Sequence, residues 1–158
     1  MGKQGIKVVG LDVKELINDL NHAYCDEWLA MYSYWLMSKI VVGAGYEDMG
    51  EFLEKIAKDE LEHAGELADR IHELGGLPIS NPMEIEKNAN APYPRPPKDM
   101  ANYDDIIKVV TGAEAGAIDV YQKIAAKTQG KDHVTYQLAC HILTEEVAHE
   151  EMFENLLG

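Results

Sequence analysis

Cysteine is scarce in this sequence, because Cys25 and Cys140 are the only two and lie far apart. No CxxC pair is present, which excludes zinc ribbons, rubredoxin-type iron sites and thioredoxin-type redox chemistry. We expect both cysteines to be reduced, partly buried thiols, because cytosolic conditions keep thiols reduced.

Long apolar runs are also missing. No stretch approaches the roughly 20 apolar residues of a membrane-spanning helix, so no membrane contact is predicted. The first residues, MGKQGIK, lack the apolar core of a signal peptide. We therefore expect a cytoplasmic protein.

Basic residues are few. The chain has 14 Lys and Arg against 28 Asp and Glu, for a formal net charge of -14. Such a charge repels the DNA backbone, and the N-terminal arm offers only Lys3 and Lys7 against it. The charge balance argues against DNA binding and favours cations as partners.

Proline is confined to one stretch, from Pro78 to Pro97, which holds all six prolines. Outside that stretch, apolar residues recur at spacings of three and four, a pattern that predicts long helices. Four are predicted: Val13 to Val42, Tyr46 to Leu74, Tyr103 to Thr128, and Lys131 nearly to Gly158.

The connections between these helices are short, long and short. Asp12 is a predicted N-cap with Glu15 at the capping-box position, and the sequence GGLP from Gly75 is a strong helix stop. Asn81 and Pro82 are expected to begin a short helix inside the long connection. The order predicts an all-α single domain over residues 1–158, with an N-terminal arm at 1–12. Its fold is a four-helix bundle with one long crossover, residues 75–102, between helices 2 and 3.

Each predicted helix carries an apolar stripe that is interrupted near its middle by acidic and histidine residues. In the fourth helix the stripe is Ala139, Ile142, Glu146, His149, Phe153 and Leu156. The interrupting residues of all four helices are Glu27, Glu60, His63, Glu114, Glu146 and His149. Carboxylates buried without compensation cost several kcal/mol, and no Lys or Arg lies on these stripes. Two divalent cations would neutralise the four carboxylates.

The spacing of these residues also suits metal binding. Glu60 and His63 form a Glu-x-x-His pair, as do Glu146 and His149, and residues i and i+3 leave a helix on one face. Each helix hairpin supplies a single Glu, a Tyr seven residues later and one such pair, an internal repeat that predicts two metals related by a pseudo-twofold axis. The alternative is a buried ion-pair network without metal. Two looser pairs, Asp19 with His22 and Asp69 with His72, are out of register with the stripes and are expected to be surface pairs.

Several segments resemble the ferritin superfamily, and the likeness extends over nearly the whole chain. The stretches Glu27–Tyr34 (EWLAMYSY), Asp59–Ala64 (DELEHA) and Glu145–His149 (EEVAH) resemble bacterioferritin site segments. The stretches Asp26–Ala30 (DEWLA) and His141–Glu146 (HILTEE) are most similar to the bacterioferritin-related branch called Dps-like proteins.

The resemblance implies a di-iron centre with defined roles for these residues. Glu60 and Glu146 would bridge two iron ions. Glu27 and His63 would complete one site, and Glu114 and His149 the other. Further supporting roles are implied for Asp59 and Glu145, which would orient the histidine rings, and for Tyr34 and Tyr121, which would hydrogen-bond the carboxylates. For the two tyrosines, core packing is an equal alternative.

The resemblance also implies an activity, ferroxidase. The protein would oxidise Fe(II) with H2O2 or O2 and mineralise Fe(III) inside a hollow homo-oligomeric shell, for iron storage and protection against oxidative stress. Carboxylate and imidazole donors also suit manganese or zinc. The alternatives are a rubrerythrin-like or manganese-catalase-like enzyme that consumes peroxide without storage, and a non-catalytic or zinc-occupied bundle.

Three features depart from the family pattern. Leu61 stands where bacterioferritins place the haem-binding Met, which argues against haem. Gly116 and Tyr136 stand where Dps-like proteins carry a cysteine pair, so a thiol switch beside the centre is not expected. The chain ends nine residues after His149, which leaves no room for a fifth helix and favours a shell of twelve subunits over one of 24.

Overall fold

A computed structural model describes residues 2–157, and within that range the chain forms helices and no strand. The helices are α1 (Lys3–Lys7), α2 (Val13–Ile40), α3 (Tyr46–Glu73), the short 3-10 helix η1 (Pro82–Glu84), α4 (Ile85–Asn88), α5 (Tyr103–Thr128) and α6 (His133–Glu154). The predicted all-α fold is confirmed, and α1 is an unpredicted turn of helix within the N-terminal arm. None of the helices in this range combines the length and apolar character of a membrane span.

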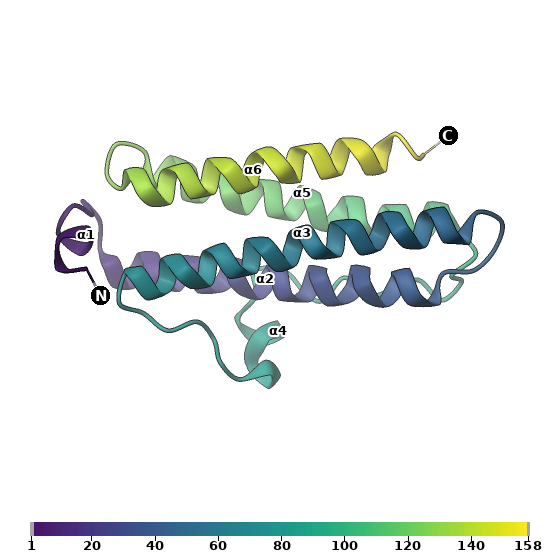
Figure 1. The fold of residues 1–158 in the computed structure, drawn as a ribbon, viewed down its shortest axis with the longest axis horizontal. Helices are drawn as coiled ribbons and strands as arrows, with labels where there is room; N and C mark the ends of the chain where they lie inside the picture. Colours follow the sequence, from purple (N-terminus) through teal and green to yellow (C-terminus); the bar gives the residue numbers. More distant parts are fainter. Residues whose placement is uncertain (1, 158) are drawn as a thin grey trace.

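The four long helices form two antiparallel hairpins that pack into one bundle (Figure 1). Helices α2 and α3 make one hairpin and α5 and α6 the other, and the connection through α4 runs back along the bundle before α5 begins. As a result α2 and α5 are antiparallel neighbours, as are α3 and α6. This is the predicted topology with one crossover.

Two of the helix ends follow the sequence signals closely. The carboxylate of Asp12 accepts hydrogen bonds from the backbone N–H groups of Lys14 (2.8 Å) and Glu15 (3.1 Å), so the predicted N-cap is confirmed. Helix α3 ends at a left-handed glycine, Gly75, with φ of 88°. The following Gly76 N–H donates to the carbonyl of Ile71 at 2.9 Å, which closes the helix end.

Helix α6 is shorter than predicted at both ends. It begins at His133 because the side chain of Asp132 caps it, accepting from the N–H groups of Val134 and Thr135, both at 3.2 Å. It ends at Glu154, so Leu156 lies beyond the helix and is 46% exposed. The prediction that Leu156 continues the inward stripe is wrong, because helical periodicity no longer orients a side chain past the helix end.

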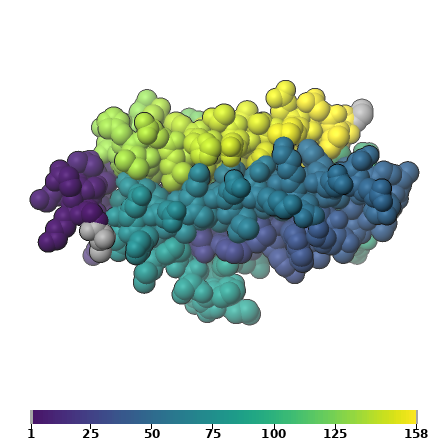
Figure 2. All heavy atoms as spheres, viewed as in Figure 1, coloured from purple at the N-terminus to yellow at the C-terminus, as the bar shows by residue number. Residues whose placement is uncertain are grey.

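The core consists of two apolar layers with a polar layer between them. The first, the Leu16 layer, contains Leu16, Leu20, Ala23, Leu67, Ile71, Leu74, Tyr121, Ile124, Ala125, Ala139 and Ile142. The second, the Met37 layer, contains Tyr34, Met37, Val41, Met49, Leu53, Ile56, Ala57, Ile106, Ile107, Val110 and Phe153. Each buried aliphatic side chain contributes about 1.5–3 kcal/mol, so these layers hold the helices in place around the polar residues. Figure 2 shows α3 and α6 closing one face of the bundle, with the segment around α4 standing out from it.

Candidate metal centre

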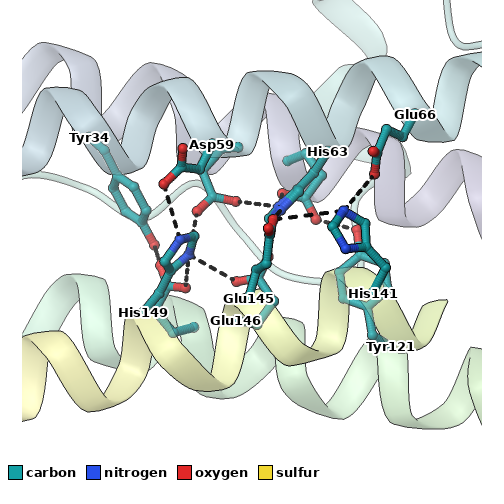
Figure 3. Close-up of polar contacts among 12 residues, drawn as sticks. Tyr34, Asp59, His63, Glu66, Tyr121, His141, Glu145, Glu146 and His149 are labelled. Carbon is teal, nitrogen blue, oxygen red and sulfur yellow. Dashed lines mark hydrogen bonds and ion pairs between the residues drawn. The ribbon is translucent and has the colours of Figure 1, made fainter. Parts of the chain in front are cut away.

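The polar layer consists of the six residues that interrupt the predicted apolar stripes. None of them is more than 3% exposed: Glu27, Glu60, His63, Glu114, Glu146 and His149. Helices α2 and α5 each supply one glutamate, and α3 and α6 each supply a Glu-x-x-His pair. Figure 3 shows His63, Glu146 and His149 pointing into the space between the helices. The fold therefore brings together all six residues that the sequence singled out.

Their donor atoms fall into two overlapping groups. Glu27, Glu60, His63 and Glu146 each offer one donor atom, and these atoms lie within 4.8 Å of one another. The second group is formed in the same way by Glu60, Glu114, Glu146 and His149. Glu60 and Glu146 belong to both groups, so their carboxylates lie where two neighbouring cations would share them.

Each histidine directs its Nδ1 atom at three carboxylates. His63 Nδ1 lies 3.0 Å from Glu146, 3.4 Å from Glu60 and 3.7 Å from Glu27. His149 Nδ1 lies 3.3 Å from Glu60, 3.5 Å from Glu114 and 3.9 Å from Glu146. The two ring centroids are 6.1 Å apart. The pseudo-twofold arrangement expected from the internal repeat is thus present in the side-chain contacts.

A second set of polar residues supports the six. His63 Nε2 lies 2.7 Å from Glu145, and His149 Nε2 lies 3.4 Å from Asp59 (Figure 3). Tyr34 donates its hydroxyl to Glu114 at 2.5 Å, and Tyr121 donates to Glu27. These contacts fix the orientation of the rings and carboxylates without any metal. The roles of these four residues at a metal stay a prediction.

Burial and crowding determine the protonation of the centre. Burial, aided by the charges of Glu146 and Glu60, raises the pKa of Glu27 well above its ordinary value. Burial and the charge of Glu60 do the same to the pKa of Glu114. For Glu60, the close imidazoles of His149 and His63 outweigh burial, and the pKa falls to about 2. In the absence of metal, this environment therefore favours the protonated form of Glu27 and Glu114.

The pKa values of the two histidines are raised, whereas burial usually lowers the pKa of an imidazole. Burial by itself lowers the pKa of His149, but the surrounding carboxylates of Glu114, Glu146 and Glu60 raise it to about 12. The same balance, with Glu146, Glu27 and Glu60 as neighbours, raises the pKa of His63. The surrounding carboxylates thus favour the cationic form of both imidazoles, which partly replaces the positive charge that a metal would bring.

Several donor atoms of the cage are buried without a hydrogen-bond partner. They are Glu60 Oε1, His63 Nδ1, Glu114 Oε2, Glu146 Oε1 and His149 Nδ1. Although some lie close together, their geometry does not meet the requirements of a hydrogen bond. An unsatisfied buried polar atom costs about 1–3 kcal/mol. The donor set, oxygen and imidazole nitrogen, is one that iron, manganese and zinc accept, so the residues fit a pair of metal ions.

The looser Asp-x-x-His pairs lie away from this centre. Asp19 binds Lys127 at 2.6 Å, and His22 contacts the carbonyl oxygen of Asn88 and the amide of Asn18. Asp19 and His22 therefore do not form the expected surface pair. The side chains of Asp69 and His72 are exposed, and no ion pair joins them among the described residues.

The cysteines remain separate thiols. Cys25 in α2 is buried, Cys140 in α6 is half-buried, and both are free, as expected. Burial and the neighbouring charge of Asp26 raise the pKa of Cys25 to about 11, so it is an unreactive thiol at neutral pH.

Two features of the structure have no counterpart in the sequence prediction. One is a buried ion pair in which Arg70 of α3 binds Asp132, with Nη2 at 2.9 Å from Oδ2. The other is a cavity of about 460 Å³ between α2, α5 and the segment 90–94, which reaches the carboxylates of the cage. Gly112 and Gly116, one helical turn apart in α5, line this cavity, but their spacing alone does not indicate it.

Comparison with known protein families places residues 17–158 in the ferritin-like domain. The chain therefore belongs to the ferritin-like family, and the family resemblance found in the sequence is confirmed. One relative is a DNA protection during starvation protein from Pyrococcus furiosus, 35% identical over 155 residues, which are 96% of this chain and 82% of the relative. Another is a bacterioferritin from Desulfovibrio desulfuricans, 30% identical over 145 residues, 90% of this chain and 74% of that one.

Solved structures agree with this assignment. A dodecameric thioferritin, the bacterioferritin-related protein of Bacteroides fragilis, superposes with a TM-score of 0.93 at 38% identity, covering 99% of this chain and 93% of that one. Dps from Thermosynechococcus elongatus shares the fold with a TM-score of 0.85 at 16% identity, covering 92% and 91% of the two chains. The chain is therefore similar to Dps and bacterioferritin-related proteins, with buried carboxylate and histidine groups compatible with metal binding.

Proposed function

We propose that this protein oxidises Fe(II) at the six-residue centre and stores the product as a subunit of a hollow shell. The observation that carries the proposal is the pair of overlapping donor groups, eight donor positions supplied by six buried residues. Five atoms of these residues are buried without a hydrogen-bond partner. Burying four carboxylates and two imidazoles in this arrangement makes physical sense with cations among them.

The reaction balances with Fe(II) as the substrate. One electron leaves each of two Fe(II) ions, and H2O2 takes both electrons with two protons to give two waters. With O2 as oxidant, the same two electrons and two protons yield H2O2. Glu27, Glu60 and His63 would hold one ion, and Glu114, Glu146 and His149 the other, with Glu60 and Glu146 shared.

The chain's own groups have defined tasks in this scheme. Glu145 and Asp59 lie at the Nε2 atoms of the two histidines, where they would keep Nδ1 turned toward the metal. Tyr34 and Tyr121 each hydrogen-bond one oxygen of a terminal carboxylate, which leaves the other oxygen for the ion. The apolar layers pack above and below the centre and close it along the bundle axis.

Storage of the Fe(III) product requires that several chains assemble into a hollow shell. The Bacteroides fragilis protein, which this chain matches over 99% of its length, is described as dodecameric. We propose a homo-oligomeric shell for this chain, with twelve subunits favoured. Native mass measurement tests this directly, because a shell has about twelve times the mass of one chain and a lone bundle has the mass of one.

A direct test compares the rate of Fe(III) formation in the wild type, Glu60→Gln and Glu146→Gln by stopped-flow absorbance. We expect each variant to lose at least about 100-fold in rate, because both shared carboxylates are needed to hold two ions. Glu62→Gln and Glu151→Gln are matched controls on the exposed faces of the same helices, and they should keep the wild-type rate. Equal rates in all five proteins would show that this centre is not the site of oxidation.

The main alternative is a peroxide-consuming dimetal enzyme of the same architecture without a storage role. The two functions differ in the fate of the metal. A storage subunit retains many more than two irons per chain after repeated Fe(II) addition and gel filtration, whereas a simple enzyme retains about two. Retention of only two irons, with continued peroxide turnover, would favour the alternative.

A further inference from the structure

The 460 Å³ cavity joins the surface between α2 and α5 to the proposed iron centre. Its inner end is formed by carboxylates of the cage, among them Glu60, Glu114 and Glu146, each 1% exposed. Each of these three residues has one buried oxygen without a hydrogen-bond partner. The outer end is bordered by Asn90, Asp119 and Lys123, whose side chains are exposed. The cavity thus extends from the surface to carboxylate residues of the cage.

The walls between these two ends are mainly apolar. They are formed by Leu29, Ala30, Val109, Ala113, Ala117 and Val120. A hydrated divalent cation would have to exchange its water for apolar side chains along this path, which is unfavourable. A small uncharged molecule such as H2O2 or O2 meets no such penalty.

Two glycines of α5 keep this cavity open. Gly112 and Gly116 both line it, and a Cβ atom added at either position would have no heavy atom within 4 Å beyond its immediate surroundings. A side chain there would therefore grow into empty space. Glycine inside a helix is destabilising relative to alanine, so packing and helix propensity both fail to explain the two glycines.

The outer side of the cavity is bounded by a fixed piece of the crossover segment. Asp26 of α2 accepts hydrogen bonds from Asn90 N at 2.7 Å and Asn90 Nδ2 at 2.6 Å. Further along, Ser33 donates to the carbonyl of Pro94 at 2.5 Å. These bonds tie residues 90–94 to α2 beside the opening, so the cavity has a defined wall instead of a loose loop.

We propose that this cavity is the passage by which the small uncharged oxidant reaches the iron centre, and that Gly112 and Gly116 set its width. The inference rests on the proposed Fe(II) oxidation. H2O2 or O2 would enter between α2 and α5, and the metal would not enter on this side of the bundle.

The test replaces Gly116 with residues of increasing size, Gly116→Ala, Gly116→Val and Gly116→Leu. Fe(II) is loaded without oxygen, and Fe(III) formation is followed after mixing with H2O2 or, separately, with O2. We expect the rate to fall with side-chain size, at least tenfold for Gly116→Leu, and the two oxidant series show which molecule uses the passage. Gly65→Leu is the matched control, because Gly65 is also helical, has equally open surroundings and does not line the cavity.

Two readouts do not depend on turnover. Zn(II) binding measured by calorimetry should be the same in the wild type and Gly116→Leu, because the metal ligands are untouched. Xenon-pressurised crystals should show xenon in the cavity of the wild type and none in Gly116→Leu. If Gly116→Leu folds poorly, Gly112→Leu fills the same cavity from the neighbouring turn of α5.

The outcomes separate this inference from the proposed function. A wild type that binds Zn(II) but does not oxidise Fe(II) overturns the proposed function, and the inference with it. A wild type that oxidises Fe(II), with Gly116→Leu and Gly112→Leu equally fast for both oxidants, overturns the passage alone. Slower Zn(II) loading in the plugged variants would also overturn it, because the cavity would then admit the metal.

Discussion

Tyr34 in α2 donates a hydrogen bond to Glu114 in α5 at 2.5 Å, and Tyr121 in α5 donates an equivalent hydrogen bond to Glu27 in α2. Each hairpin therefore steadies the single carboxylate of the other hairpin. Both tyrosines are buried, so the two hydrogen bonds lie inside the core. A carboxylate that lost its tyrosine partner there could not hydrogen-bond to water instead.

Replacing Tyr34 by Phe should weaken metal binding without unfolding the bundle. The ring stays in the Met37 layer, and only the bond that orients Glu114 is lost. We expect a tenfold to 100-fold loss of Zn(II) affinity, about the usual effect of removing such a supporting bond, and a loss of about 1–3 kcal/mol in unfolding free energy. Titration calorimetry and urea unfolding measure the two effects. The exposed Tyr32→Phe is the control, and an equal affinity loss there would contradict the specific role of Tyr34.

The buried pair of Arg70 and Asp132 should be essential for stability. Arg70 is 6% exposed, Asp132 is 2% exposed, and Arg70 also donates to Thr135 at 2.9 Å, so the group joins the end of α3 to the start of α6. Arg70→Met leaves Asp132 buried without its partner, and we expect a loss of about 3–5 kcal/mol. Glu73→Gln removes only the exposed contact of Arg70 and should cost less than about 1 kcal/mol. Similar urea midpoints for the two variants would contradict this account.

The same pair should contribute to acid sensitivity. Burial raises the pKa of Asp132, but hydrogen bonds from Thr135 and Arg70 outweigh it and hold the pKa below its ordinary value. A carboxyl with a lowered folded pKa stabilises the protein above its unfolded pKa, and this stability is lost as the pH falls below about 4. Asp132→Asn should therefore be less stable at pH 7 and show a flatter fall in stability below pH 4. Parallel curves for the wild type and Asp132→Asn in that range would rule out the contribution.

Metal binding should release protons and weaken as the pH falls. Glu27, Glu114 and both histidines have raised pKa values without metal, which favours the protonated form of each. A proton held by any of these groups must leave before that group can serve as a ligand. Zn(II) titrations in buffers of different ionisation enthalpy should therefore report a release of protons on binding at pH 7.

Removing the metal should also lower the melting temperature, because a ligand at about 100 times its Kd adds about 2.7 kcal/mol of stability. In Glu60→Gln the stabilisation by Zn(II) should shrink, while in the exposed Glu62→Gln it should remain.

For the prediction of proton release, Zn(II) binding without any release of protons would mean that the metal-free cage is already deprotonated. The raised pKa values of its carboxyl groups and histidines would then be wrong.

Much of the fold could be predicted because local signals and periodicity agree in this chain. The bounds of α5, Tyr103 to Thr128, match the prediction, and the Asp12 cap and the Gly75 stop act where expected. The metal candidates could be found for the same reason: a Glu or a His on an apolar stripe has to face the core, and i, i+3 spacing puts two of them on one face. Helix α6 begins two residues later than predicted, because its Asp132 cap is held by Arg70 of α3, a contact between separate helices that periodicity within α6 does not indicate.

The order of residues along the chain was thus enough to give four helices, a single crossover, and six polar groups turned inward, since these depend on spacing within each helix. Which of those groups share a metal, how Tyr34 reaches Glu114, and where an opening leads to them depend on how separate helices meet. Side-chain distances between helices follow from packing the Leu16 and Met37 layers together, and that packing has no signature in any one segment. The passage beside Gly116 likewise depends on packing between helices, because a cavity is defined by all the elements that surround it.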